Sequence, residues 1–313
     1  MTTRFGLPAA ALLALTALSG CLDTLEEVGD DIGDTITGGG GSDAAFEAPP
    51  WPAVDAATVR PGVQMISEGG QCTSNFVFTS PDNRTLYLGF AAHCVGEGES
   101  TDTNGCDTPS LPLGSAIEIQ GASQPAELVY SSWQTMEDVG ETDGAACSYN
   151  DFAVVALHPD DRGMVHPAMF HFGGPTELAP SVEVGETVLT FGNTGLRPGP
   201  EELDRRQGLV VANGGDGWTH TVYTATPGLP GDSGSGVLTG DGRALGVLVT
   251  LGIAPLAGSN GVTNLLKAMD YAQENAGLQL QLATWEQFSG NALGAPDLIG
   301  LPIEPAVPSS VLP

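Results

Sequence analysis

The chain has 313 residues, about two domain-sized units, and is strongly acidic: 38 Asp and Glu against 9 Lys and Arg, a formal net charge of −29 at pH 7. So few cations argue against nucleic-acid binding, because no basic patch is available to neutralise phosphates. Hydrophobic residues make up 41% of the chain and charged residues 15%, which allows a packed core and differs from a disordered composition. The 44 glycines and 23 prolines favour short strands joined by turns over long helices.

Residues 1–20 predict a secretory signal, because Arg4 precedes a short apolar run from Leu7 to Leu18. The run ends in Leu18-Ser19-Gly20-Cys21, which resembles the bacterial and archaeal lipobox, in which the cysteine is lipidated and becomes the first mature residue. A lipidated Cys21 would hold the protein on a membrane surface. The alternative is an ordinary signal peptide cut nearby, with Cys21 a spare thiol. Either reading predicts an extracytoplasmic protein, lipid-anchored to the cell membrane or secreted.

Residues 21–58 predict a tether. From Leu22 to Ala57 the chain has nine acidic residues, no Lys or Arg, and four consecutive glycines from Gly38 to Gly41. Such a segment has too little apolar surface to fold alone and repels itself into an extended form. We expect the folded body to occupy residues 59–276, followed by a C-terminal extension, 277–313, to which no role is assigned.

The cysteines predict disulfides. If Cys21 is lipidated, Cys72, Cys94, Cys106 and Cys147 remain, an even number in an exported chain, for which three pairings are possible. No pair has Cys-x-x-Cys spacing, so a zinc or thioredoxin-type site is not expected. Disulfides are the default in an oxidising compartment.

Three short segments contain the residue types of nucleophilic catalysis. A predicted hairpin, with strands at 71–80 and 85–90, leads into Ala91-Ala92-His93-Cys94. Asp151 opens an apolar strand, and Gly231-Asp232-Ser233-Gly234 precedes another apolar run. Each alone has an ordinary structural interpretation: a packed histidine, a turn or cap acid, a glycine turn. Taken together, in the chain order His, Asp, Ser, the three segments indicate a catalytic site.

These motifs resemble those of the trypsin-like (chymotrypsin-fold) serine endopeptidases, whose chain order is also His, Asp, Ser. The resemblance covers about residues 59–276. It implies an all-β fold of two six-stranded antiparallel Greek-key β-barrels with a C-terminal helix. It also implies the disulfides Cys72–Cys94 and Cys106–Cys147.

The resemblance assigns roles to single residues. His93 would take the proton from Ser233 and later give it to the leaving amine, while Asp151 holds the imidazole tautomer. The backbone N–H groups of Gly231 and Ser233 would form the oxyanion hole. The implied substrate is a polypeptide, no cofactor or metal is needed, and we expect a monomer.

Asp232 departs from the pattern of the activated animal enzymes, in which this position pairs with a freed N-terminal amine. The stretch Val59-Arg60-Pro61-Gly62-Val63-Gln64 contains no Ile-Val-Gly-Gly-type activation site. Asp232 therefore needs another partner or ordered water. We expect a bacterial-type member that folds directly into its active form.

Substrate preference is weakly encoded. Pro227 stands where trypsins carry an acid, so preference for Arg or Lys before the cleaved bond is unsupported. The expected pocket wall comprises Pro227, Val249, Thr250, Leu251 and Gly261, with Leu251 narrowing the pocket toward small or apolar side chains. His220 would read an acidic side chain if it lay in this pocket, but the favoured interpretation is an exposed strand residue.

The remaining patterns predict structure rather than chemistry. Val262, Leu265, Leu266, Met269 and Ala272 recur at helical spacing before Gly277, and 278–282 alternates like a strand. The acid clusters at 102–107 and 137–143 lack calcium-loop spacing and are expected to be solvated surface. His158, His166 and His171 are expected to be ordinary loop or core residues. Extreme acidity with one lysine resembles halophilic proteins.

Two functions of different class remain. The first is a tethered serine endopeptidase with the triad His93, Asp151 and Ser233. The second is a catalytically silent binding or adhesion protein on the same fold. Retention of all three residues and Gly231 favours the enzyme. An esterase is a weaker third possibility, because acyl transfer to serine is common to both reactions.

Overall fold

The structure is a computed structural model that describes residues 49–68, 70–98, 102–197, 204–252 and 257–290. The predicted signal and most of the predicted tether lie outside these residues. The strands are β1 (Gln64–Ser67), β2 (Gly70–Thr73), β3 (Val77–Thr79), β4 (Leu86–Phe90), β5 (Ala116–Ile119), β6 (Ala126–Ser131), β7 (Ala153–Ala156), β8 (Thr187–Phe191), β9 (Arg205–Gly214), β10 (Thr219–Thr224), β11 (Gly236–Thr239), β12 (Ala244–Leu251), β13 (Asn260–Asn264) and β14 (Gln281–Leu282). The α-helices are α1 (Ser132–Val139), α2 (Gly144–Tyr149) and α3 (Leu265–Ala276).

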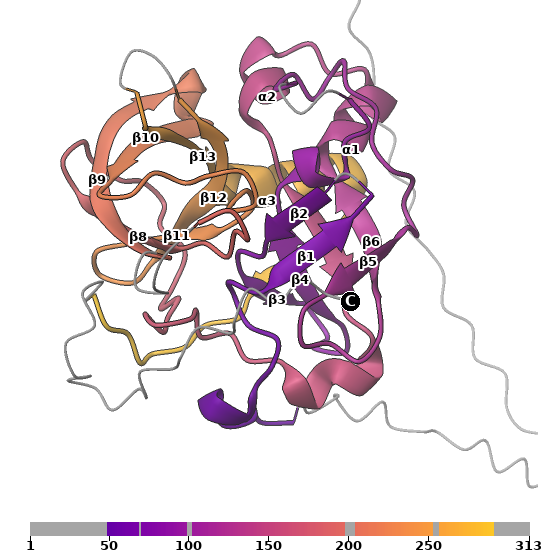
Figure 1. Cartoon of the computed structure of the whole chain (residues 1–313). Helices are drawn as coiled ribbons and strands as arrows, with labels where there is room; N and C mark the ends of the chain where they lie inside the picture. The colour runs from indigo at the N-terminus through magenta and orange to yellow at the C-terminus, as the bar shows by residue number, and fades with distance from the viewer. Residues whose placement is uncertain (1–48, 69, 99–101, 198–203, 253–256, 291–313) are drawn as a thin grey trace, which may run out of the picture. The chain divides into compact units, whose positions relative to one another are not determined.

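Strands β8 to β13 form a closed six-stranded antiparallel barrel, on the left in Figure 1. Its order, β10-β13-β12-β11-β8-β9, contains a Greek key, because β11 returns to lie beside β8 after the β8-β9-β10 meander. Apolar side chains from all six strands fill the interior, among them Val188, Val222, Val237 and Val262, all fully buried. The predicted second barrel is confirmed.

The first half of the body, on the right in Figure 1, is an eight-stranded sheet rather than a closed six-stranded barrel, with the order β14-β3-β4-β7-β6-β5-β1-β2. The strands β2 and β3 are two parts of one extended segment that changes partner at Ser74. The Ser74 N–H donates to Val63 O (2.9 Å), whereas the Asn75 N–H donates to Gly89 O (2.8 Å). One segment thus hydrogen-bonds to both β1 and β4, so the sheet curls round as in the two-barrel trypsin-like fold.

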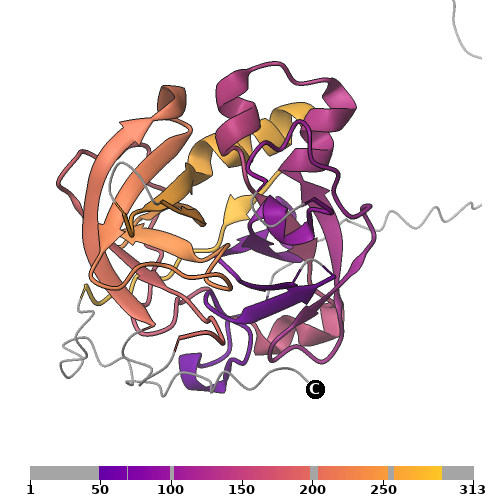
Figure 2. The ribbon, with the colours of Figure 1, turned by 45° about the horizontal axis from the view of Figure 1, so that its top comes forward.

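The C-terminal helix is confirmed as α3, which packs on α1 and β12 (Figure 2). The Asn264 side chain caps it by accepting a hydrogen bond from the Lys267 N–H (3.0 Å). Gly277 ends it in the left-handed conformation, with φ +68°. Val262, which fits the helical spacing, belongs instead to β13.

Helices α1 and α2 lie between β6 and β7, within the region expected to be solvated acidic surface. Ser131 caps α1, Gly140 ends it with φ +67°, and the Asp143 carboxylate caps α2 by accepting from the Ala145 and Ala146 N–H groups. Asp143 thus has a structural role as a helix cap, whereas Glu137 and Asp138 are exposed residues of α1.

The chain beyond residue 276 continues to pack on the body. β14 adds to the edge of β3, pairing Leu282 with Phe78. The Trp285 N–H donates to Pro175 O (2.8 Å), and the Phe288 ring lies against Gly242, where an added Cβ would come within 2.7 Å of it. The first part of the extension, to residue 290, is thus an integral strap of the folded body.

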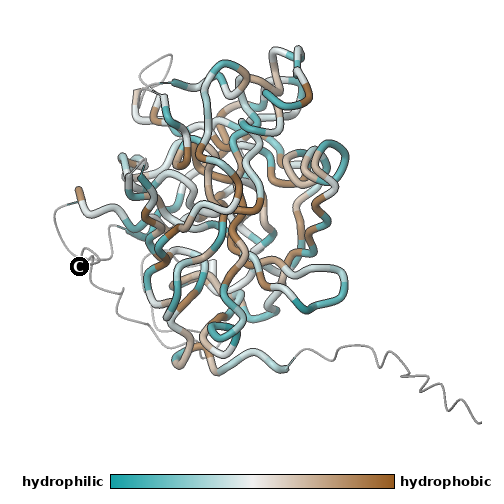
Figure 3. The backbone as a smooth tube through the Cα atoms, turned by 90° about the vertical axis from the view of Figure 1, so that its right-hand side faces the viewer, coloured by the Kyte–Doolittle hydropathy of each residue, from teal (hydrophilic) through white to brown (hydrophobic). Residues whose placement is uncertain are grey.

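Both disulfides implied by the resemblance are present, Cys72–Cys94 and Cys106–Cys147. Figure 3 shows hydrophobic residues concentrated along segments in the interior and hydrophilic ones in the outer loops. His166 belongs to the core: its ring is fully buried, packs at 4.6 Å against Trp285, and accepts a hydrogen bond from the Ala168 N–H at Nδ1. Within the described ranges, no helix has both the length and the apolar character needed to cross a membrane.

Candidate active site

His93 and Asp151 meet because β4 and β7 are antiparallel neighbours. Phe90, the last residue of β4, pairs with Ala153, the first residue of β7, so the residues just after β4 and just before β7 share one end of the sheet. His93 Nδ1 lies 2.7 Å from Asp151 Oδ2. The His93 backbone N–H also donates to Asp151 Oδ1 (2.9 Å), which fixes the carboxylate against the short 3-10 helix η2 (Ala92–Val95).

The environment of His93 favours its charged form. Burial of the ring lowers the pKa of His93, but the negative charge of Asp151 and its hydrogen bond outweigh this effect, so the pKa is raised above its ordinary value. The Asp151 carboxylate accepts, so Nδ1 carries the hydrogen and the lone pair of the neutral ring is on Nε2. In the neutral ring, Nε2 is therefore the nitrogen that can accept a proton.

Ser233 lies in a tight loop pinned on two sides. Its carbonyl accepts from the Thr73 N–H (2.8 Å), and the Gly234 N–H donates to Leu248 O (2.7 Å). Gly234 has φ +92°, and a Cβ there would lie 2.3 Å from Thr73 O, so only glycine fits. These bonds attach the loop to the first sheet through β2 and to the barrel through β12.

Gly231 also requires glycine, with φ +96°. Its carbonyl accepts from Thr73 Oγ1 (2.7 Å) and Gln71 Nε2 (3.3 Å). Among the hydrogen bonds of the described residues, neither the Gly231 N–H nor the Ser233 N–H has a protein acceptor. Both N–H groups are therefore available to an oxygen of a ligand.

Asp232 has the partner that the sequence left open. Its fully buried carboxylate receives hydrogen bonds from Arg206 Nη1 (2.7 Å) and from Arg197 Nη2. The backbone N–H groups of Leu229 (2.9 Å) and Thr194 (3.2 Å) donate to it as well. These two arginines neutralise Asp232. They take the place that a freed N-terminal amine has in the activated animal enzymes.

Gly192 makes room for this ion pair. A Cβ at Gly192 would lie 2.1 Å from Asp232 Oδ1 and 2.5 Å from Arg206 Nη2. No motif in the sequence singles out Gly192, Arg197 or Arg206. The only available signal was the scarcity of cations, since two of nine lie beside one buried acid.

Two cavities adjoin Ser233 and His93, and both residues line each of them. One, of about 530 Å³, lies on the side of the Cys72–Cys94 disulfide. The other, of about 490 Å³, lies along β12. No hydrogen bond joins Ser233 to His93 among the described residues, and such bonds are commonly long until substrate binds.

Three of the five expected pocket-wall residues line the cavity along β12: Val249, Thr250 and Leu251. Pro227 and Gly261 do not, and their neighbours Gly228 and Asn260 take that place. Asn260 Oδ1 accepts from the Gly228 N–H (2.8 Å), and Asn260 Nδ2 donates to Thr250 O (2.9 Å). The Asn260 amide thus holds two walls of the cavity together.

Neither interpretation of His220 is correct. The residue is 4% exposed, so it is not an exposed strand residue, and it lines neither cavity. Nδ1 lies 2.7 Å from Asn213 Oδ1 and Nε2 lies 3.0 Å from Asn264 Nδ2. His220 instead links β9, β10 and the N-terminal cap of α3.

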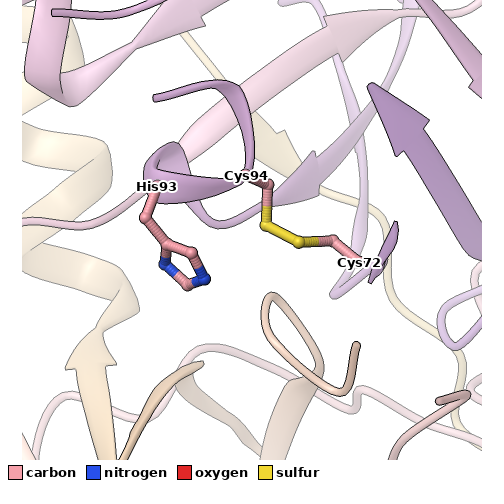
Figure 4. A group of neighbouring side chains, drawn as sticks. All are labelled: Cys72, His93 and Cys94. Atoms are coloured by element: carbon pink, nitrogen blue, oxygen red, sulfur yellow. A yellow bond between two sulfur atoms is a disulfide. The ribbon is translucent and has the colours of Figure 1, made fainter. Parts of the chain in front are cut away.

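Cys72, His93 and Cys94 form the one group of possible metal donors found among the described residues. Figure 4 shows the two sulfurs bonded to each other beside the His93 ring. A disulfide leaves no thiolate to bind a metal. The group therefore braces η2 rather than forming a metal centre.

The comparisons with known proteins agree with this fold. The family model of the trypsin-like peptidase domain matches residues 77–247, more than half of the chain. No curated protein sequence matches. The chain belongs to the trypsin-like peptidase domain family and is a serine-type peptidase, so its substrates are polypeptides.

Solved structures of bacterial proteases are similar to the chain. Thermobifida fusca protease A has a TM-score of 0.47 at 17% identity, over 74% of this chain and 100% of that one. A Nocardiopsis protease gives 0.44 at 16%, over 73% and 100%. Cellulomonas bogoriensis chymotrypsin gives 0.43 at 16%, over 73% and 100%.

Proposed function

We propose that the chain is a serine endopeptidase tethered at the cell surface, acting through an acyl-enzyme formed on Ser233. The single observation that carries this proposal is the His93–Asp151 pair, with Nδ1 2.7 Å from the carboxylate, in a cleft that Ser233 also lines. Asp151 holds the ring so that Nε2 is free to act as a base. A serine hydroxyl needs such a base to attack at neutral pH.

The loop of Gly231 and Ser233 supplies the nucleophile and the oxyanion hole of the proposed reaction. As Ser233 Oγ attacks the carbonyl carbon, His93 takes the hydroxyl proton, and the N–H groups of Gly231 and Ser233 donate to the developing oxyanion. His93 then gives the proton to the leaving amine, and the carbon–nitrogen bond breaks. Water hydrolyses the acyl-enzyme by the same route, with His93 again as base.

The cavity along β12 fits the acyl side of the substrate. Its wall of Leu248, Val249 and Leu251 is apolar, and the Asn260 amide is already engaged by Gly228 and Thr250. The acids that line this cavity are Asp102 and Asp151, of which Asp151 is engaged by His93, and the β12 wall itself offers no counter-charge to a charged side chain. We therefore expect small or apolar residues before the cleaved bond.

Anchoring belongs to the proposal as well. Disulfides are typical of oxidising, extracytoplasmic compartments, and the protein contains two. We infer that Cys21, the first residue of the acidic tether (residues 21–58), is lipidated and that the folded body is monomeric. Partition into the detergent phase that is lost in Cys21→Ser is the expected result, and partition that survives the substitution contradicts the lipid.

Labelling by a fluorophosphonate probe in high salt tests the enzyme. We expect the wild type to be labelled and Ser233→Ala and His93→Ala to be unlabelled, with all three folded by circular dichroism. A folded wild type that stays unlabelled would favour the catalytically silent binding protein. A peptide library then distinguishes a peptidase from an esterase.

A further inference from the structure

We propose that Glu68 and Glu97 give the cavity beside the Cys72–Cys94 disulfide a preference for a Lys or Arg side chain on the leaving-group side of the substrate. This inference rests on the proposed peptidase function and deepens it by naming a substrate class. It concerns the residues after the cleaved bond, whereas the cavity along β12 takes those before it.

The placement of the catalytic groups decides which part of the substrate enters this cavity. The two cavities share His93, Asp102, Pro230 and Ser233, so the bond to be cleaved lies where they meet. The leaving amine must reach His93 to be protonated. With the acyl part along β12, the leaving chain passes His93 on the side where Figure 4 shows the disulfide.

Glu68 is held at the rim of this cavity by the β1–β2 hairpin. It lies in the turn between Ser67 and Gly70, which pair directly. Ser67 Oγ donates a hydrogen bond to Cys94 O, and the disulfide to Cys72 joins β2 to the same helix, η2. The turn that carries Glu68 is thus fixed to the segment that carries His93.

Glu97 follows η2 directly and is fixed by its backbone. Its N–H donates to Pro109 O (2.9 Å), and the Leu111 N–H donates to Val95 O (2.7 Å). Glu97 and the two residues before it are therefore part of a small ladder next to the disulfide. The backbones of Glu68 and Glu97 are therefore held in position before a substrate binds.

The charge of this cavity is unbalanced. Glu68, Glu97 and Asp102 line it, and no Lys or Arg lines either cavity. Neither the Glu68 nor the Glu97 carboxylate has an ion-pair or hydrogen-bond partner in the part of the chain that the structure describes. A substrate cation would be the first counter-charge these two groups meet, and an exposed pair of this kind supports up to about a fivefold preference.

Transfer of a fixed acyl group to different amines measures the preference of the leaving-group side separately from that of the acyl side. An acyl-enzyme formed from a p-nitrophenyl ester with an apolar acyl group is offered argininamide or citrullinamide, which have nearly the same shape but differ in charge. The measured quantity is the ratio of the two rates of amide formation. We expect a ratio of about two to five in the wild type, and a ratio near one in Glu68→Gln/Glu97→Gln.

Glu127→Gln is the matched control, because Glu127 is an exposed acid on β6 that lines neither cavity. Its ratio should equal that of the wild type. A wild-type ratio near one overturns the inference, and so does an equal fall in the control, which would assign the preference to the overall acidity. Absence of any p-nitrophenol burst overturns the proposed function itself, and is thereby distinguished from failure of the preference alone.

Discussion

Asp232 illustrates, at the scale of single residues, how a buried charge is stabilised in this fold. A carboxylate that is wholly removed from water is tolerated only when cations and N–H donors surround it. Arg206 Nη1 at 2.7 Å and Arg197 meet this need within the folded chain. We therefore expect the loop that carries Ser233 and Gly231 to take its shape without any cleavage of the chain.

Arg206→Met should remove the better-buried cation and leave Asp232 undercompensated. Breaking a buried pair typically costs about 3–5 kcal/mol, and we expect the lower end because Arg197 remains. Urea unfolding measures the loss, and fluorophosphonate labelling should fall with it. Arg243→Met is the control: its partner Asp241 is 64% exposed, so its loss should cost less than about 1 kcal/mol. Equal losses in the two variants would contradict this account.

The raised pKa of His93 predicts the acid side of the activity profile. A base must be neutral to accept the serine proton, so activity is lost as pH falls through the pKa of His93. Because this pKa is raised above 6.5 by Asp151, the midpoint of kcat/KM against pH should lie above 6.5.

Asp151→Asn removes the charge that raises the pKa of His93, so burial alone should move the midpoint to lower pH. The rate itself should fall by about 10⁴-fold, because the wrong tautomer is then favoured. A midpoint unchanged in Asp151→Asn would contradict the role given to Asp151.

At the scale of elements, helix caps and a short edge strand order parts of the fold that the hydrophobic periodicity of the sequence does not predict. Asp143 at the start of α2 and Gly140 at the end of α1 order a region that otherwise looks like acidic surface. β14 covers the outer edge of β3, which would otherwise expose unpaired backbone groups. These elements are short, and their stability comes from the body they pack on.

Truncation tests the strap after α3. A chain ending at Gly277 loses β14, the Trp285 contact with His166 and the Phe288 contact with Gly242. We expect its free energy of unfolding to be at least about 3 kcal/mol lower than that of a chain ending at Gly290, because the truncation removes two packed aromatic rings, Trp285 and Phe288. Thermal and urea unfolding of the two chains are compared. Matching midpoints would show that the strap is dispensable.

At the scale of the whole molecule, the dominant physical fact is the net charge of −29. Self-repulsion of this size disfavours a compact state, and dissolved salt screens it over distances of about 3 Å at molar concentration. In the part of the chain that the structure describes, the acidic side chains are mostly solvent-facing, whereas cations such as Arg206 engage specific partners.

The body should therefore be more stable in molar KCl than in dilute buffer. The expected result is a higher Tm with added KCl, and no comparable rise with a neutral osmolyte of equal osmolality. Equal melting temperatures in dilute buffer and concentrated KCl would count against screening as a source of stability.

The sequence by itself determined the motif residues, their order and the fold class, because the short motifs around His93, Asp151 and Ser233 are local and specific. It also determined α3, whose cap Asn264 and stop Gly277 lie within the same segment. The closed second barrel followed from the resemblance carried by those motifs.

Only the tertiary structure decided the partners that lie far apart in the chain. Arg206 meets Asp232 because β8, β9 and β11 close into one barrel, and the segment 70–79 changes partner at Ser74 because two strands flank it. His220 is buried between Asn213 and Asn264 for the same reason. Such contacts depend on barrel closure and strand register, which bring together residues with no local signal for one another.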